Sequence, residues 1–261
     1  MPGIIYIGTS GYSYDEWRGV LYPAALGKAL MLNHYSRFFN CVEINFTYYR
    51  EPTTAILQGM EKKTPENFKF VVKATKAMTH ERTEGLPAFK RFCTSLTPLI
   101  QSGKFGAVLA QFPWGFKNTA ENQDYLKRFR DYTASLPVVI EFRNNNWINE
   151  QTIMLLQSLE LNFCCVDEPD IPSLPPRCAW VTGAIGYVRF HSRDATRWWN
   201  TDTQQSRYDY LYTQPELQEW VPKIQSMNTT TRETYVFFNN HHHGNAVSNA
   251  RDIQALLIHK K

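Results

Sequence analysis

The 261-residue sequence lacks several features that would assign it to a common functional class. It has no apolar run long enough to span a bilayer, and its first residues, MPGIIYIGTSGY, turn polar without forming a targeting leader. Its formal net charge is only +4, from 28 Lys and Arg against 24 Asp and Glu, too small an excess to indicate a nucleic-acid or membrane partner. From these absences we predict a cytoplasmic protein with no membrane partner, and we treat nucleic acid as an alternative that is not favoured.

Recognisable cofactor and metal motifs are also missing. The stretch GTSGYSYDEW, which follows the first apolar run, lacks the GxGxxG spacing of dinucleotide-binding folds. No HExxH motif or metal-binding cysteine pair occurs, and the adjacent cysteines at 164–165 would face opposite sides of a strand, so we expect reduced thiols. We therefore predict no cofactor and no metal site. The lesser alternative is a divalent metal bound by His241 and His243 with either Glu141 or Asp167.

What the sequence does contain is a regular alternation of two patterns. Short β-branched or aromatic runs, typical of strands, recur eight times, beginning at Ile4, Cys41, Lys69, Ala107, Val138, Asn162, Tyr187 and Thr234. Between most of them the apolar residues follow helical spacing, as in residues 28–39, 149–161 and 214–227. This alternation requires parallel strands joined by crossover helices. We predict one α/β domain over residues 1–261 with the architecture of a (β/α)8 TIM-type barrel.

Three connections depart from the regular pattern. The one after the sixth strand, PDIPSLPPRCAWVTGAI, carries four prolines and no helical spacing, so we expect an irregular segment there. The connections after the third and seventh strands, residues 74–87 and 192–213, are long and rich in polar and aromatic groups. In a barrel such loops overhang the carboxyl ends of the strands, where these folds keep their chemistry.

Polar side chains fall on the inward face near the ends of seven predicted strands. A barrel interior is normally filled by branched apolar residues, and an unpaired buried charge costs several kcal/mol. The set comprises Glu43, Asn45, Lys73, Gln111, Glu141, Arg143, Asp167, Arg189, His191 and Asn240, with Asn239 replacing Asn240 if a bulge shifts the strand. We expect these groups to converge on one site; the alternative is a structural ion network without chemistry.

Within this set the residue types suggest separate roles. The candidate catalytic residues are Glu141, Asp167 and His191, since paired carboxylates and an imidazole can divide acid and base functions. The basic residues Lys73, Arg143 and Arg189 suit an anionic ligand. The remaining predicted ligand-binding residues are Glu43, Asn45, Gln111, Asn239 and Asn240, together with His80 in the third loop and the aromatic Tyr12, Trp17 and Tyr48.

Seven motifs that cover almost the whole chain occur in a fixed order: GTSGYSYDEWRGVLYP, HYSRFFNCVEINFTYYREPT, TPENFKFVVKATKAMTH, AQFPWGF, EFRNNNW, VRFHS and FFNNHHHGNAVSNA. Together they resemble the YecE-like family, also called domain of unknown function 72. The resemblance implies a TIM-type barrel and leaves the function open. One position departs from the family pattern, because Ser192 stands where the family usually has glycine.

These observations favour one function and leave two others open. The favoured function is an enzyme, a hydrolase, lyase or isomerase, that acts on a phosphorylated or carboxylated small molecule at the carboxyl ends of the strands. The first alternative is a nucleic-acid-binding or processing barrel related by fold to metal-dependent endonucleases, although seven histidines are few for a multi-metal site. The second is a non-catalytic metabolite-binding protein, so the pattern does not decide whether the protein is an enzyme.

Overall fold

Parallel strands and surrounding helices make up the described part of the chain. The computed structural model describes residues 2–199 and 206–258. The strands are β1 (Ile4–Thr9), β2 (Cys41–Ile44), β3 (Lys69–Lys73), β4 (Phe105–Gln111), β5 (Val138–Glu141), β6 (Asn162–Phe163), β7 (Cys165–Asp167), β8 (Ile185–Phe190) and β9 (Glu233–Phe238). Every predicted strand position is occupied, and the sixth predicted strand is divided into β6 and β7 at Cys164.

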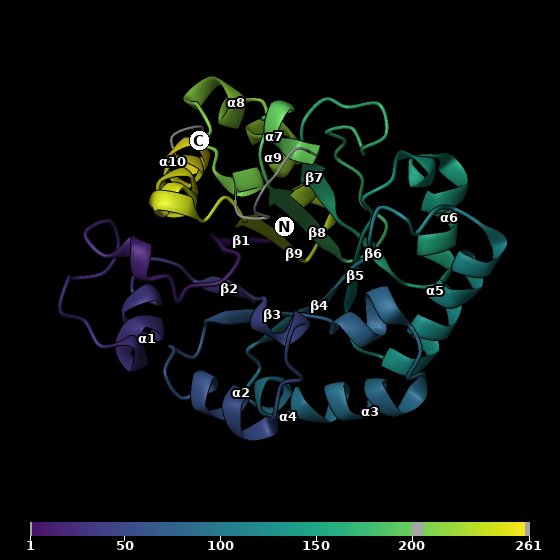
Figure 1. The fold of residues 1–261 in the computed structure, drawn as a ribbon, viewed down its shortest axis with the longest axis horizontal. Coiled ribbons are helices and arrows are strands. Elements are labelled where there is room, and N and C mark those ends of the chain that lie inside the picture. The colour runs from purple at the N-terminus through teal and green to yellow at the C-terminus, as the bar shows by residue number, and fades with distance from the viewer. Residues whose placement is uncertain (1, 200–205, 259–261) are drawn as a thin grey trace.

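Helices connect most of the strands and lie outside them (Figure 1). They are α1 (Met31–Tyr35), α2 (Thr54–Glu61), α3 (Leu86–Ser95), α4 (Thr97–Gln101), α5 (Ala120–Thr133), α6 (Glu150–Ser158), α7 (Thr196–Trp199), α8 (Gln214–Gln218), α9 (Val221–Thr230) and α10 (Asn245–Ile258). Short 3₁₀ or π turns lie at η1 (Asp15–Trp17), η2 (Lys28–Leu30), η3 (Phe46–Tyr48), η4 (Ala77–Glu81), η5 (Asn145–Trp147), η6 (Ser206–Tyr208) and η7 (His242–Gly244). None of the helices described could cross a membrane, because each is too short or too polar.

The strands form two parallel sheets. Their orders are β1-β9-β8-β7 and β2-β3-β4-β5-β6, and every described pair runs parallel. This confirms the α/β class with parallel strands. The closed ring of strands predicted for a (β/α)8 barrel is not confirmed. The continuous strand pairing stops between β1 and β2 and again between β6 and β7.

Local contacts bring the two sheets together at both edges. A single parallel bridge pairs Ser10, just after β1, with Glu43 of β2. At the other edge the side chain of Asn162 replaces part of the missing ladder. Its amide nitrogen donates to the Val138 carbonyl at 2.9 Å, and its oxygen accepts from the Ile185 backbone N–H at 2.9 Å. A buried asparagine in an apolar run is therefore explained, since it satisfies backbone groups of β5 and β8 at once.

The interior between the sheets changes from apolar to polar along the strands. An inner cluster of buried apolar residues includes Val71, Leu109, Val139, Tyr187 and Phe237. Strand side chains alternate faces, so the residue two positions later points the same way. In each of these five strands that residue is polar, and the five are Lys73, Gln111, Glu141, Arg189 and Asn239. The apolar layer thus supports a polar layer at the carboxyl ends.

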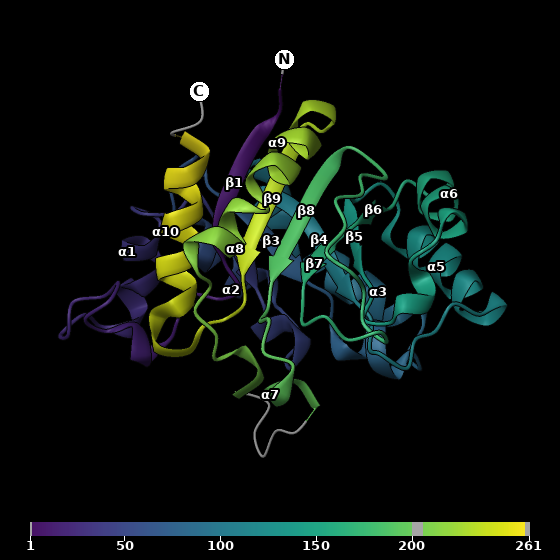
Figure 2. The same cartoon turned by 90° about the horizontal axis from the view of Figure 1, so that it is seen from above.

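The three irregular connections lie where they were predicted. Residues 168–184, which join β7 to β8, contain no helix or strand. The loop after β3 carries the π turn η4, and the segment after β8 carries α7 and η6. Figure 2 shows α7 beyond the arrowhead of β8, on the side opposite the N-terminus. Both long loops are therefore placed beside the polar layer.

Candidate functional site

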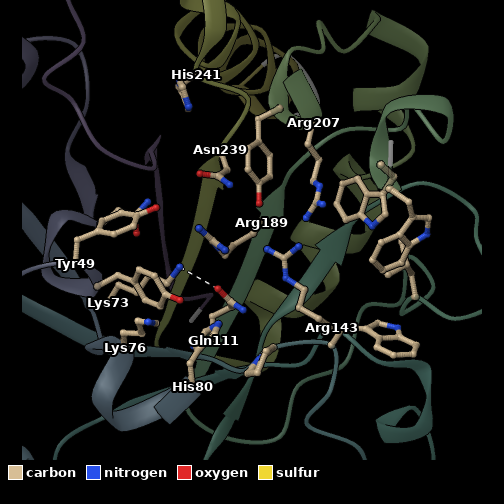
Figure 3. A pocket seen from close by; sticks show the side chains of 18 of the residues that line it. Tyr49, Lys73, Lys76, His80, Gln111, Arg143, Arg189, Arg207, Asn239 and His241 are labelled. Atoms are coloured by element: carbon tan, nitrogen blue, oxygen red, sulfur yellow. Dashed lines mark hydrogen bonds between the residues drawn. The ribbon is translucent and has the colours of Figure 1, made fainter. Parts of the chain in front are cut away.

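A pocket of about 590 Å³ opens at the carboxyl ends of the strands (Figure 3). Its walls come from the strand ends and from the loops after β1, β2, β3, β4, β7, β8 and β9. The charged side chains that line it are all basic: Lys73, Lys76, Arg143, Arg189 and Arg207. Among the residues described by the structure, no aspartate or glutamate lines this pocket. Its surface is therefore biased toward anions.

Arg189 forms the floor of the pocket and is almost entirely enclosed by carboxylates. Its Nε and Nη2 atoms lie 3.0 and 2.6 Å from the two oxygens of Glu43, and its Nη1 lies 2.6 Å from Oε2 of Glu141. The Tyr187 hydroxyl also donates to Glu43, at 2.7 Å. Only 1% of Arg189 is exposed. This part of the predicted site is a buried ion network in which the charges satisfy one another.

A second group of ionisable side chains surrounds Arg143, which follows β5. Its Nε lies 2.5 Å from Oε1 of Glu141, and its Nη1 lies 2.5 Å from Oε1 of Glu168. Its Nη2 lies 3.1 Å from Nε2 of His191. The ends of β5, β7 and β8 thus place an imidazole and two carboxylates around one guanidinium.

Burial and neighbouring charges perturb these ionisable groups in different directions. Burial would raise the pKa of Glu141, but Arg143 and Arg189 outweigh it and hold that pKa well below its usual range. Burial raises the pKa of Glu168 to about 7, even though Arg143 opposes the shift. Burial, and then the charge of Arg143, lower the pKa of His191 well below its usual range. At neutral pH Glu141 is therefore ionised and His191 is neutral.

Lys73 lies in the pocket beside an amide and an aromatic ring. Its Nζ donates to Oε1 of Gln111 at 2.9 Å and lies 4.7 Å from the centre of the Tyr48 ring. Burial, assisted by the charge of Arg189, lowers the pKa of Lys73 to about 7. Within the described residues it forms no ion pair, so its ammonium group is available to a ligand.

His80 reaches the same region from the π turn η4. Its ring packs edge-on to Tyr48, with 4.9 Å between the ring centres, and its Nδ1 lies 2.9 Å from the Thr79 hydroxyl. Burial, followed by the charges of Lys73 and Lys76, lowers the pKa of His80 to about 4. It is thus a neutral hydrogen-bonding group at physiological pH.

Aromatic side chains form the rim. Tyr49, Trp114 and Trp199 are 80%, 40% and 51% exposed, whereas Trp198 is buried. The guanidinium of Arg207 lies 5.2 Å from the Trp198 ring centre and 5.9 Å from that of Trp199. Exposed rings next to basic groups can stack on a planar or sugar-like part of a ligand.

Most of the predicted site residues do converge here. Eight of them line the pocket: Asn45, Tyr48, Lys73, His80, Gln111, Arg143, Arg189 and Asn239. Three others, Glu43, Glu141 and His191, lie fully buried beneath it and contact Arg143 or Arg189. The geometry brings these side chains together, and it leaves their catalytic roles as predictions.

Asp167 does not belong to this group, and its predicted placement is wrong. Its carboxylate points to the helical layer, where it accepts from Trp220 Nε1 at 2.6 Å, Tyr212 at 3.1 Å and Arg193 at 2.7 Å. The inward face of this strand carries Cys164, Val166 and then the next acidic residue, Glu168. A one-residue difference in register moves a strand side chain to the other face.

Asn240 likewise lies outside the pocket. Its Nδ2 donates to the Tyr210 carbonyl at 2.7 Å and to Oδ1 of Asn249 at 3.0 Å. It therefore fixes α10 and the loop after β8, and Asn239 is the residue that lines the pocket.

Two of the predicted aromatic residues, Tyr12 and Trp17, also lie outside the pocket. Trp17 is fully buried, and its Nε1 donates to the His241 carbonyl at 2.8 Å. The Tyr12 carbonyl accepts from the Tyr22 hydroxyl at 2.5 Å, and neither Tyr12 nor Trp17 lines the pocket. Tyr14, from the same loop, lines it instead.

The structure does not bring together the residues of the metal alternative through the histidine run. His241 lines the pocket, and its Nδ1 lies 3.0 Å from Oε1 of Glu16. In the described chain, the group of metal-ligating side chains that approach one another consists of Glu141, Glu168 and His191. Neither His241 nor His243 belongs to it.

The site residues that the sequence reasoning missed include Lys76, Trp114, Glu168 and Arg207. Three of them come from loops whose path has no periodic pattern. The only sequence signal for Glu168 is its position directly after the strand, next to Asp167.

Comparison with known proteins places the chain among proteins without an assigned activity. A family model described as "Protein of unknown function DUF72" matches residues 6–261. UPF0759 protein YunF of Bacillus subtilis is 32% identical, over 97% of this chain and 95% of that protein. UPF0759 protein YecE of Escherichia coli K12 is 32% identical over 43% of this chain and 39% of that protein.

Solved structures agree over nearly the whole length. A DUF72 family protein from Thermotoga maritima has a TM-score of 0.90 at 35% identity and covers 98% of this chain and 99% of its own. A DUF72 family protein from Enterococcus faecalis has a TM-score of 0.88 at 29% identity, covering 98% and 96% of the two chains.

Proposed function

This chain belongs to the DUF72 family, and since that description states no activity, we propose from the pocket itself that the protein binds a phosphorylated or carboxylated small molecule at its strand ends. The ligand enters the space of about 590 Å³ above Arg189. Lys73 and Arg143 contact its anionic group, and the aromatic rim contacts the remainder.

The observation that carries this proposal is that the acidic groups lie buried beneath the pocket, whereas basic groups face it. The carboxylates of Glu43, Glu141 and Glu168 are fully buried and paired with guanidinium groups, whereas the charged side chains that line the pocket are basic. Low-dielectric walls strengthen the field of basic groups on an anion in a pocket. Lys73 contributes directly, because it pairs with no carboxylate in the described part of the chain.

We further propose that the bound molecule undergoes a reaction that requires proton transfer, as in a hydrolase, lyase or isomerase. Lys73 is suited to this role, since a pKa of about 7 gives both protonation states at neutral pH. Glu141 is a poor base, because two guanidiniums stabilise its ionised form. In this proposal Glu141 and His191 position Arg143, and Lys73 transfers the proton.

Binding of pyrophosphate, followed by isothermal titration calorimetry, tests the anion site. Wild-type protein should bind one equivalent, and Lys73→Met should weaken the affinity by at least tenfold because the unpaired ammonium is lost. Lys127→Met is the matched control, since Lys127 is exposed on α5 and pairs with Asp124. Absence of saturable binding to the wild type, or equal affinity in Lys73→Met, would reject the proposal.

Two finer features of the molecule are proposals as well. We propose that the two sheets act as one eight-stranded (β/α)8 barrel, supported by the Ser10–Glu43 bridge and the Asn162 side chain that spans β5 and β8. We also propose a cytoplasmic location, which the five free cysteines support because thiols persist in reducing compartments.

A second candidate ligand is single-stranded nucleic acid, and the exposed rim favours it. Tyr49, Trp114 and Trp199 offer ring faces to bases, beside the basic Lys76 and Arg207. A fluorescent oligonucleotide that binds in low salt and is displaced by pyrophosphate would support this candidate. An oligonucleotide that does not bind leaves the small anion as the ligand.

A further inference from the structure

The guanidinium of Arg143 is surrounded on three sides by groups that bind metals. We propose that Glu141, Glu168 and His191 form a site for a divalent transition-metal ion such as Mn²⁺ or Zn²⁺, and that Arg143 fills the site when the metal is absent. The proposal concerns a cation site beside the pocket, and it does not depend on which anion the pocket binds.

The spacing of the three side chains suits a single ion. Nε2 of His191 lies 3.3 Å from Oε1 of Glu141 and 3.9 Å from Oε1 of Glu168, and the ligand atoms all lie within 4.8 Å of one another. Metal–ligand bonds of about 2.0–2.2 Å place neighbouring ligand atoms about 3–4 Å apart. Two carboxylates and one imidazole, with further positions for water or substrate, favour a transition metal over Ca²⁺ or Mg²⁺.

The hydrogen bonds of His191 leave the lone pair of Nε2 directed toward the proposed metal position. Arg143 Nη2 lies 3.1 Å from Nε2, so in this arrangement Nε2 is an acceptor and the proton is on Nδ1. Nδ1 in turn lies 3.1 Å from the side-chain amide of Asn239, whose oxygen accepts this proton once the amide is turned to face it. A histidine fixed in this way by an outer hydrogen bond is the usual arrangement of a metal ligand.

Two oxygen atoms of the cluster are left unsatisfied by Arg143. Oε1 of Glu141 and Oε2 of Glu168 are buried and have no hydrogen-bond partner of acceptable geometry, and the same is true of Arg143 Nε. The guanidinium is thus close to Glu141 but badly aligned with it. Unsatisfied buried carboxylate oxygens are rare in native proteins, and these two are suited to a cation or a proton donor.

The charges of the buried cluster also fit a divalent ion. The carboxylates of Glu43, Glu141 and Glu168 face the two guanidiniums of Arg143 and Arg189, which leaves one negative charge in excess when all are ionised. Replacing the single charge of Arg143 with a divalent ion removes this excess. A buried cluster is most stable when its charges balance.

Arg143 has space to leave the site. Its side chain is 10% exposed and already lines the pocket, so a rotation about its side-chain bonds moves the guanidinium into that space. There it would join Lys73 as a second free basic group.

Titration with MnCl₂ alone, followed by electron paramagnetic resonance of free Mn²⁺, tests the site. Arg143→Ala should bind one Mn²⁺ at least tenfold more tightly than wild type, because the competing cation is removed. Adding Glu168→Gln to this variant should abolish the gain. His243→Asn is the control, since His243 is exposed and lies outside the cluster, and it should bind as wild type does.

Folding of each variant is monitored by circular dichroism, and Mn²⁺ should raise the melting temperature of Arg143→Ala and not that of the double variant. A folded Arg143→Ala that binds no more tightly than wild type overturns the proposal, as does binding that survives Glu168→Gln. If Arg143→Ala does not fold, weak binding to the wild type is compared with Glu168→Gln alone. A loss of at least tenfold then supports the site, and equal binding rejects it. Since no anionic ligand is used, these results are independent of the pyrophosphate titration.

Discussion

Replacing Arg189 by methionine should strongly destabilise the fold. Arg189 makes three contacts of 2.6–3.0 Å with Glu43 and Glu141, and the three side chains are at most 1% exposed. Methionine keeps most of the apolar volume and removes the charge, so the main effect is an unpaired buried carboxylate at Glu43. Breaking a buried ion pair by removing one partner costs about 3–5 kcal/mol.

The expected change is large enough for thermal unfolding to measure. At about 2–4 °C per kcal/mol for a large domain, the loss of about 3–5 kcal/mol lowers the melting temperature by roughly 6–20 °C. Tyr187→Phe removes only the hydroxyl that donates to Glu43 at 2.7 Å and should cost about 1.5–3 kcal/mol, the range for a hydrogen bond to a charged group. Arg189→Met should therefore be the less stable of the two variants.

The pH dependence separates this explanation from a simple packing defect. In Arg189→Met a carboxyl group without its partner takes up a proton as the pH falls, which removes the penalty of a buried charge. The difference in melting temperature between wild type and Arg189→Met should thus shrink from pH 8 to pH 5. A difference below about 2 °C at pH 7, or one that does not change with pH, would refute the ion-network argument.

Three further predictions test the site. Pyrophosphate binding should weaken as the pH rises through about 7, because the Lys73 ammonium is lost there, and Lys73→Arg should extend binding to higher pH, as calorimetry at each pH would show. The folded-state pKa of Glu168 is raised to about 7, so its contribution to stability is present at acidic pH and is lost as the pH rises to 7. Glu168→Gln should therefore reduce the fall in melting temperature between pH 5 and pH 7. Asp167→Asn should lower the melting temperature, because Arg193 loses its buried partner, and should leave pyrophosphate affinity unchanged; a weakened affinity would return Asp167 to the site.

The strand positions were predictable because they depend on local composition. Each run of β-branched and aromatic residues is long enough to define a strand, and the residue types at its end are fixed by the sequence. Where one face is clearly polar at the last positions, as in β5 and β8, alternation also predicted the face correctly. Glu141, Arg189 and His191 all point inward, as expected.

The face of the sixth strand could not be predicted in the same way. The run from Phe163 to Val166 is apolar on both faces, as expected for a strand buried on both sides, and it ends in two adjacent acidic residues. Only one of Asp167 and Glu168 can point inward, and local sequence gives no preference. The choice is made by tertiary partners, since Trp220, Tyr212 and Arg193 bind Asp167 on the outer side.

The loop residues of the site could not be predicted either, because tertiary packing sets their positions. Lys76, Trp114 and Arg207 come from segments without periodicity, and their positions depend on how each loop packs on its neighbours. The ring of Trp114 packs edge-on to Trp199, with 6.2 Å between ring centres, although the two residues are 85 positions apart in the chain. No local pattern predicts such a contact.

Glu141 links the stability of the fold to the chemistry of the pocket. One of its oxygens lies 2.6 Å from Arg189, in the structural network, and the other lies 2.5 Å from Arg143, in the proposed cation site. If Arg143 leaves, Arg189 still holds one Glu141 oxygen in place, so the other remains oriented toward Glu168 and His191. The buried network therefore keeps the three ligands arranged whichever cation lies between them, which lets Arg143 be exchanged without unfolding the strand ends. Under this reasoning Glu141→Gln should lower both the melting temperature and the affinity for Mn²⁺, whereas Glu168→Gln should lower the Mn²⁺ affinity with a smaller change in melting temperature at pH 7.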